Sequence, residues 1–199
     1  SMGTQFLKGD SHDSPRRSGE LKRPSLSLFA DLYELTMAQA YWQNGVTAQA
    51  TFSLYFRSCP PDRAYFFVLG GIQDALECLG GLQFSDVEIK YLRSQGQLAE
   101  EFIEFLRRLC FTGSARAMPE GTIFFANEPV IEVTAPVIQA QIVETFILNQ
   151  INLQSILATK ASRVVHAAQG KVVIDLAARR AHGIDAANEL ARVGYMAGF

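Results

Sequence analysis

Apolar residues recur at helical spacing in several stretches of the chain, and the first of these stretches is residues 28–44. Ala38 and Trp42 lie four residues apart, so a helix here would bury them on one face. Asp31 stands near the start of the run, and Glu34 follows it by three residues, which is the spacing of a capping box. The pattern therefore predicts a helix that begins after Asp31 and fills the rest of this stretch.

The same spacing recurs along the chain and alternates with segments that have the two-residue period of strands. Pro136 begins an apolar run that reaches almost to Gly170 and is long enough for two helices. Residues 113–136 contain three short runs separated by turns, which predicts a small antiparallel β module. The other predicted elements are strands at residues 47–57 and 65–69, and helices at residues 72–79, 85–94 and 98–109.

Spacing alone favours a structural interpretation for several polar and aromatic residues. Tyr33 lies away from the main apolar face of the first predicted helix, and we interpret it at this stage as a core aromatic residue. Glu100 and Glu101 open a predicted helix, where carboxylates offset the helix dipole. A long helix carries Thr159, Lys160 and Arg163 on its polar side, which predicts a face in contact with solvent, with an anion site as the less favoured alternative.

The last part of the chain reads as a strand, a loop and a helix. Val172 to Asp175 form a short apolar strand, and the helix begins near Ile184. Ligands commonly bind at the loops that follow the carboxyl ends of strands, where Asp175, Arg179 and Arg180 lie, so the two arginines are candidates for holding a small anion. The Asp175 carboxylate could instead hold ribose hydroxyls or order the loop, and a structural ion pair fits the spacing equally well.

Composition excludes several classes of protein. With 199 residues, 48% of them hydrophobic, the chain can bury a sizeable core. A formal net charge of −2 argues against general binding of nucleic acid. No apolar run approaches the ~18 residues of a membrane span. Cys59, Cys78 and Cys110 are far apart in sequence, which fits a reducing cytoplasm. We expect residues 1–24 to be a disordered tail that begins with the remnant of a cleaved tag.

Motifs for metal, nucleophile and phosphate chemistry are missing from the sequence. His12, His166 and His182 are scattered, so no metal-ligand spacing exists and we expect no protein-bound metal. There is no Gly-x-Ser-x-Gly nucleophile elbow and no Gly-x-Gly-x-x-Gly loop. Gly170-Lys171 lacks the first glycine of a Walker A loop. Binding of an anion by the arginine loop is what remains.

Five segments, taken in order, resemble nicotinate phosphoribosyltransferase. They are LFADLYELTMAQAYWQNG, TFSLYFR, EPVIEVTAPVIQAQIVET, LNQINLQSILATKASR and VVIDLAARRAHGIDAA, and the resemblance covers residues 28–199. It implies an enzyme of NAD salvage that joins nicotinate to phosphoribosyl pyrophosphate. The products would be nicotinate mononucleotide and pyrophosphate, with Mg2+ as cofactor and ATP as co-substrate.

The resemblance also implies roles for single residues. Tyr33 matches a tyrosine that stacks on the pyridine ring across the interface of a homodimer, which reverses the structural interpretation of this residue. Arg179, with Arg180 beside it, matches an arginine that meets the anionic groups of the substrate. Leu176 stands where many relatives have a second aromatic wall. The histidine that relatives phosphorylate would lie beyond Phe199, so we expect no catalytic residue within this chain, which would be about half an enzyme.

The expected fold class is α/β, of the type II phosphoribosyltransferase kind. Residues 25–135 would form an N-terminal mixed α/β domain, and residues 136–199 would provide the opening elements of an irregular β/α barrel. Two other functions stay open at this point. The chain could be a truncated, inactive homologue that acts as a structural or regulatory partner, or a relative that uses nicotinamide or quinolinate.

Overall fold

The computed structural model describes residues 27–58 and 66–199. The expected tail at residues 1–24, the tag remnant, Cys59 and the first residue of the predicted strand 65–69 lie outside this part of the chain.

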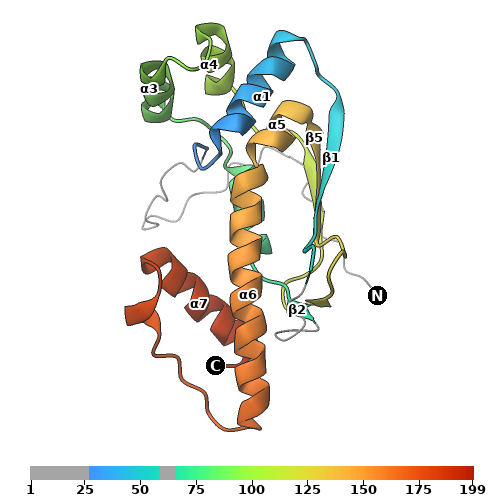
Figure 1. Ribbon diagram of the computed structural model, residues 1–199, viewed down its shortest axis with the longest axis vertical. Coiled ribbons are helices and arrows are strands. Elements are labelled where there is room, and N and C mark those ends of the chain that lie inside the picture. The colour runs from blue at the N-terminus through green and yellow to red at the C-terminus, as the bar shows by residue number, and fades with distance from the viewer. Residues whose placement is uncertain (1–26, 59–65) are drawn as a thin grey trace, which may run out of the picture.

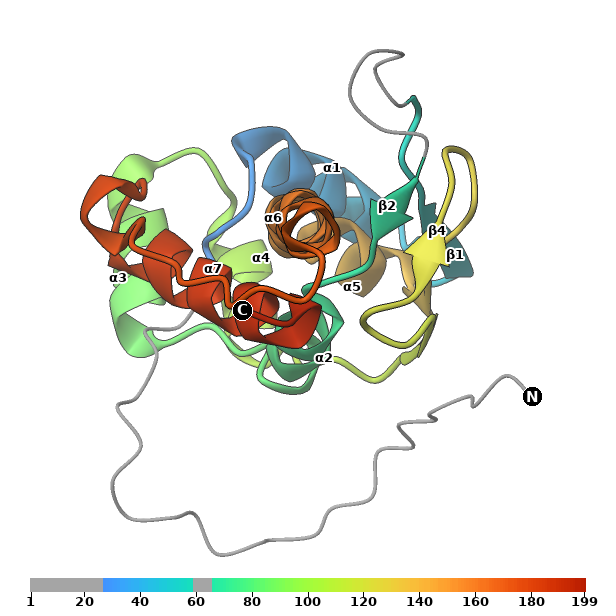
Figure 2. The same cartoon turned by 90° about the horizontal axis from the view of Figure 1, so that it is seen from below.

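The molecule is built along one long helix, α6 (Glu144–Ala168), which runs vertically through Figure 1. The short helix α5 (Val137–Ile142) precedes it, and the two are separated at Val143, so the expectation of two helices after Pro136 is confirmed. One end of α6 lies near α1 (Leu32–Gln43), and its other end carries α7 (Ile184–Ala197) at its side (Figures 1 and 2). The other elements are therefore arranged around α6.

Two small antiparallel sheets lie beside α6. The larger has the order β1 (Gln49–Leu54), β5 (Ile131–Pro136), β3 (Ser114–Ala117). The smaller pairs β2 (Phe67–Val68) with β4 (Ile123–Phe124). The three strands expected between residues 113 and 136 are confirmed, but they do not form a module of their own. β3 and β5 pair antiparallel as expected, but β5 also pairs with β1, and β4 pairs with β2 in the other sheet.

The remaining helices begin and end within two residues of where the sequence predicts, and the largest difference is at the helix predicted at residues 98–109, which spans Glu100–Arg107. α1 has the capping box formed by Asp31 and Glu34, and α3 (Asp86–Gln95) has the equivalent box formed by Ser85 and Glu88. α2 (Ile72–Gly80) and α4 (Glu100–Arg107) complete the set. The core lies between these helices, the larger sheet and the first half of α6. Hydrophobic and polar spacing was sufficient to place these elements.

A close contact between the β2–α2 turn and α6 fixes this helix against the sheets. Gly71 has φ +88°, and a Cβ added to it would lie 2.5 Å from the carbonyl oxygen of Gln150. Ser155 and Thr159 of α6 bind the same turn, since the Gly70 amide donates to Ser155 Oγ at 3.1 Å and the Val68 amide donates to Thr159 Oγ1 at 2.8 Å. Thr159 is buried, so the prediction that it faces solvent is wrong.

The predicted strand at Val172–Asp175 is also wrong. These residues form no strand, and Val172 is 89% exposed, with Ile174 and Leu176 exposed at the alternate positions. A strand needs a neighbouring strand to satisfy its amide and carbonyl groups, and the described part of the chain places none beside this segment. The loop and helix that follow were predicted correctly in outline, because a 3-10 turn (Ala178–Arg180) leads to α7.

Candidate functional site

Tyr33 lies in the first turn of α1 with its ring exposed. Its side chain is 48% exposed, so the interpretation of Tyr33 as a core residue is wrong, and its proposed role in stacking stays a prediction. The phenol oxygen lies 3.5 Å from Glu144 Oε1 at the start of α6. Partial burial and, next, the charge of Glu144 raise the pKa of Tyr33, so the phenol is neutral at physiological pH. The result is an uncharged aromatic face held at the junction of two helices.

The turn that carries Tyr33 is anchored by the buried carboxylate of Glu34, whose residue is 0% exposed. Its Oε2 accepts the Asp31 amide at 3.1 Å, and its Oε1 accepts both the amide and the hydroxyl of Thr145 at 3.1 and 2.8 Å. Burial raises the pKa of Glu34, and the hydrogen bonds from Thr145 lower it in part. These contacts tie the starts of α1 and α6 together, so the position of the Tyr33 ring depends on both helices.

The other predicted site residues lie in the segment between α6 and α7. The Asp175 carboxylate accepts the Ala177 amide at 2.8 Å, which orders the loop as one of the sequence interpretations had it. Arg179 and Arg180 are exposed in the 3-10 turn, and no carboxylate in residues 27–58 or 66–199 pairs with them. The two guanidinium groups are therefore available to an anion. Leu176 and His182 are exposed as well.

The structure does not bring all of these residues together within one chain. Tyr33 is on α1, whereas the 3-10 turn with Arg179 lies well apart along the long axis of the molecule (Figure 1). Asp175 is a near neighbour of Arg179 in the loop, and the turn that carries Arg179 packs against α7. A site that uses both Tyr33 and Arg179 therefore needs a second polypeptide or a large rearrangement.

One group that sequence reasoning missed holds α7 in place. Arg192 of α7 donates to Gln154 Oε1 of α6 at 2.9 Å and to Gln73 Oε1 of α2 at 3.3 Å, and it forms an ion pair with Glu120. Gln154 is 0% exposed and donates in turn to Asp74 Oδ2 at 2.6 Å. The partners of Arg192 come from three distant parts of the sequence, so no local pattern indicated them.

Neither metal ligation nor membrane insertion has support in the described residues. Residues 27–58 and 66–199 contain no group of three His, Cys, Asp or Glu side chains that could hold a metal ion. No helix in this part is both long and apolar enough to cross a membrane.

The chain is similar to one protein family over most of its length. Residues 28–152 match the sequence model of the nicotinate phosphoribosyltransferase (NAPRTase) N-terminal domain. Nicotinate phosphoribosyltransferase pncB2 of Mycobacterium tuberculosis is 51% identical over 172 residues, which are 86% of this chain and 37% of that protein. Nicotinate phosphoribosyltransferase of Bacillus subtilis is 42% identical over 179 residues, which are 89% of this chain and 36% of that protein.

A solved structure agrees with the sequence comparisons. The crystal structure of human nicotinic acid phosphoribosyltransferase superposes with a TM-score of 0.77 at 32% identity, over 86% of this chain and 35% of that chain. This likeness bears out the α/β fold class expected from the sequence. The chain spans little more than a third of the length of these relatives. It belongs to the nicotinate phosphoribosyltransferase family and corresponds to that family's N-terminal domain and the elements that follow it.

Proposed function

We propose that the chain forms part of a nicotinate phosphoribosyltransferase of NAD biosynthesis. In this reaction the pyridine nitrogen of nicotinate forms a bond to the anomeric carbon of phosphoribosyl pyrophosphate, and the bond from that carbon to the pyrophosphate oxygen breaks. The products are nicotinate mononucleotide and pyrophosphate. The 51% identity to the pncB2 protein, over 86% of this chain, supports this assignment.

The observation that carries the proposal is the exposed, neutral ring of Tyr33. An aromatic face binds a flat pyridine ring with little loss of entropy, and Glu144 limits the motion of the phenol. The electron-rich face also suits the partial positive charge that develops as the pyridine nitrogen is alkylated. Tyr33 would thus hold the ring, while Arg179 and Arg180 meet the carboxylate or phosphate groups.

The site is proposed to form between two copies of the chain. Tyr33 belongs to α1 and Arg179 to the 3-10 turn before α7, two segments that lie well apart in one chain (Figure 1), and both side chains are accessible from outside. Tyr33 is accompanied by other exposed apolar side chains at the same end of α1, namely Phe29, Leu32 and Met37. An exposed apolar group of this kind is typical of an interface. A homodimer would bring Tyr33 of one copy to the arginine loop of the other.

The cofactors and the location follow from the family assignment. We propose that Mg2+ accompanies the pyrophosphate of the substrate, that ATP hydrolysis is coupled to the reaction, and that the enzyme works in the cytoplasm. The cation is proposed to be bound through the phosphate oxygens of the substrate, as Mg2+ commonly is at such sites. The catalytic residues are proposed to lie in the part of the relatives that this chain does not span.

A mixing experiment tests the reaction and the shared site together. Tyr33→Ala and Arg179→Ala are made separately in the complete gene product, and pyrophosphate release from nicotinate and phosphoribosyl pyrophosphate is measured with and without ATP. Each variant alone should lose most of its activity. Co-expression of the two should restore about a quarter of the wild-type activity, because half of the dimers are mixed and each mixed dimer has one intact site.

The outcomes separate the parts of the proposal. No recovery on co-expression, with an active wild type, would contradict the shared site and leave the reaction standing. No pyrophosphate from the wild type would contradict the reaction itself. Nicotinamide and quinolinate serve as competing acceptors, and preference for either of them would assign the protein to that relative instead. Pairing of an inactive wild type with a separate active subunit would favour the regulatory alternative.

A further inference from the structure

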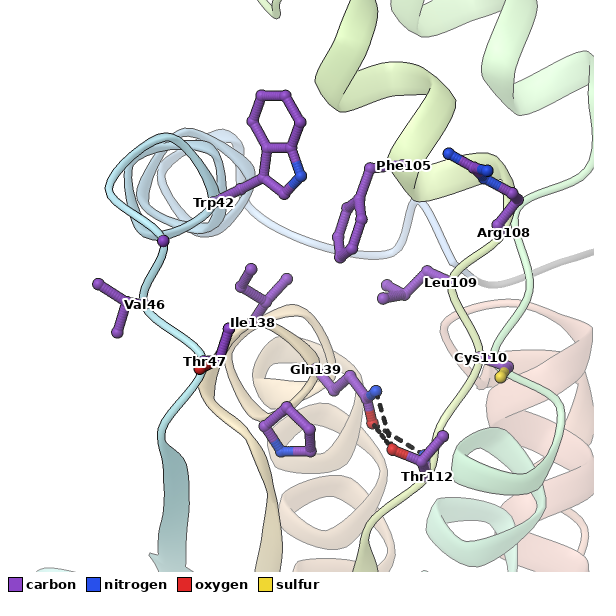
Figure 3. A pocket seen from close by; sticks show the side chains of 12 residues that line it. Trp42, Val46, Thr47, Phe105, Arg108, Leu109, Cys110, Thr112, Ile138 and Gln139 are labelled. Carbon is purple, nitrogen blue, oxygen red and sulfur yellow. Dashed lines mark hydrogen bonds between the residues drawn. The ribbon is translucent and has the colours of Figure 1, made fainter.

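A pocket of about 440 Å³ lies at the end of α1 opposite to Tyr33. It opens between the end of α1, the end of α4 and the start of α5 (Figure 3). Its volume falls in the range of roughly 300–1,000 Å³ that small-molecule sites occupy. Neither Tyr33 nor Arg179 lines it, so it is separate from the proposed pyridine site.

The walls of the pocket are largely aromatic and aliphatic. The rings of Trp42 and Phe105 have their centroids 6.3 Å apart with an angle of 40° between their planes, and both border the cavity. Leu109 and Ile138 add aliphatic surface, as Figure 3 shows. These groups favour a ligand with a flat apolar body, because aromatic rings prefer tilted or offset contacts with one another.

A single charged side chain, Arg108, lines the pocket, and no carboxylate does. Glu104 lies four residues earlier on the same helix, a spacing that would allow an ion pair. Its Oε1 is instead bound by Arg93, and its Oε2 lies 3.4 Å from the Arg107 guanidinium. No other acidic group in residues 27–58 or 66–199 pairs with Arg108. Arg108 therefore lies exposed at the rim of the pocket and has no carboxylate partner among the described residues.

The polar floor of the pocket is formed by Gln139, which is buried at the start of α5. Its Oε1 accepts the Thr112 amide at 2.8 Å, and its Nε2 lies 3.1 Å from Thr112 Oγ1. The amide group carries two N–H donors, and only one is needed for the contact with Thr112. The second can donate to an oxygen of a ligand, so the floor complements an acceptor as Arg108 does.

We propose that this pocket binds a small aromatic carboxylate, with its ring against Trp42 and Phe105 and its carboxylate on Arg108. The combination of one cation, no anion and an aromatic wall selects against neutral and positively charged ligands. The inference does not depend on the proposed enzymatic reaction, since it uses none of the residues assigned to that reaction.

Trp42 provides a direct reporter because it is the only tryptophan in the 199-residue chain. The probe is 3-phenylpropionate, added to the chain while tryptophan emission is recorded. Saturable change of the emission is expected with a dissociation constant on the order of 1 mM, as suits a ligand of this size. The matched neutral probe is 3-phenylpropionamide, which has the same shape without the charge and should bind at least about fivefold more weakly.

Two variants complete the test. Arg108→Gln should weaken binding of 3-phenylpropionate by about fivefold to tenfold, since it removes the charge-assisted hydrogen bonds. Arg116→Gln is the control, because Arg116 is another exposed arginine that lies on β3 outside the pocket, and it should leave the affinity unchanged. The proposal is overturned if the emission does not saturate at about ten times the expected constant. Equal binding of the acid to Arg108→Gln and wild type, or equal binding of acid and amide, would overturn it as well.

Discussion

At the scale of single residues, the best-defined polar contact joins Glu34 to Thr145. The Thr145 hydroxyl donates to a carboxylate that is withdrawn from solvent, and hydrogen bonds to charged groups in such places stabilise a fold by about 1.5–3 kcal/mol. This contact connects residues that are 111 positions apart in sequence. It therefore acts as a tertiary link as well as a local one.

We predict that Thr145→Val lowers the free energy of unfolding by about 1–2 kcal/mol at neutral pH. Valine keeps the branched shape but removes the donor, so the charged form of Glu34 loses a partner. The Thr145 hydrogen bond lowers the pKa of Glu34, and its loss should raise that pKa further above the usual value. Denaturant unfolding of both proteins at a series of pH values measures the difference.

The pH dependence has a definite sign. The loss of stability in Thr145→Val should be largest when Glu34 is ionised and should become smaller as the pH falls through the raised pKa of Glu34. The reason is that a hydrogen bond stabilises a carboxylate more than it stabilises a protonated carboxyl group. Thr36→Val is the matched control, because the Thr36 hydroxyl donates to a backbone carbonyl, that of Tyr33, at 3.0 Å. A defect of Thr145→Val that does not vary with pH would contradict the assigned role of the carboxylate.

What the sequence could predict at this scale depended on how local each contact is. The capping box of Asp31 and Glu34 was predictable, because its two members are three residues apart. The bond from Thr145 was not, because nothing in the sequence near Glu34 indicates it. Tyr33 is a second case in which spacing was not enough. Its spacing suggested a core residue, but its ring is exposed and the hydrogen-bond partner of its phenol, Glu144, is 111 positions away in sequence.

At the scale of elements, the contact between the β2–α2 turn and α6 fixes the position of the long helix against the sheets. Helices predicted from apolar spacing formed as expected, because their caps and buried faces are encoded within each segment. The strand predicted at residues 172–175 did not form, because a strand is completed by a neighbour rather than by its own sequence. Val172 and Ile174, whose apolar side chains prompted the prediction, are exposed.

We predict that Gly71→Ala destabilises the fold by at least about 2 kcal/mol, as strained and overpacked sites typically do. Two effects combine, because φ +88° is unfavourable for alanine and the new methyl carbon would lie 2.5 Å from the Gln150 carbonyl oxygen. The matched control is Gly80→Ala, which lies at the end of α2 with no atom within 4 Å of the added carbon.

Thermal and denaturant unfolding of the two variants measure the contrast. Gly80→Ala should be neutral or stabilise the protein by up to about 1 kcal/mol, because alanine lowers the entropy of the unfolded chain. Similar stability of Gly71→Ala and wild type would mean that the turn can move away from α6, and the close packing of Gly71 on α6 would then not be needed for stability.

At the scale of the whole molecule, α7 packs along α6 through contacts of different kinds. Val193 is buried against Val68 and Ala158, which gives the helix an apolar anchor on α6. Arg192 adds the polar contacts to Gln154, Gln73 and Glu120. Sequence reasoning directed attention to the arginines of the preceding loop, and it passed over Arg192 because a charged residue on an amphipathic helix usually faces solvent.

The loss of Arg192 should therefore loosen α7 without unfolding the remainder. In Arg192→Met the side chain keeps much of its length, but Gln154 loses a donor while it stays buried, and Glu120 loses its ion pair. We predict that amide hydrogens in α7 exchange at least about tenfold faster, as a local loss of about 1.4 kcal/mol would produce. Amides in α3 and α4, which Figure 1 places at the other end of the molecule, should exchange as before.

Hydrogen exchange followed by mass spectrometry resolves these regions, and Arg116→Met is the control for a change of charge elsewhere on the surface. Uniformly faster exchange in every helix would show that Arg192 supports the whole fold, and unchanged exchange in α7 would show that its apolar contacts suffice. The mobility of α7 also matters for the proposed site. The arginine loop leads directly into α7, so a helix that is held loosely would also position Arg179 loosely.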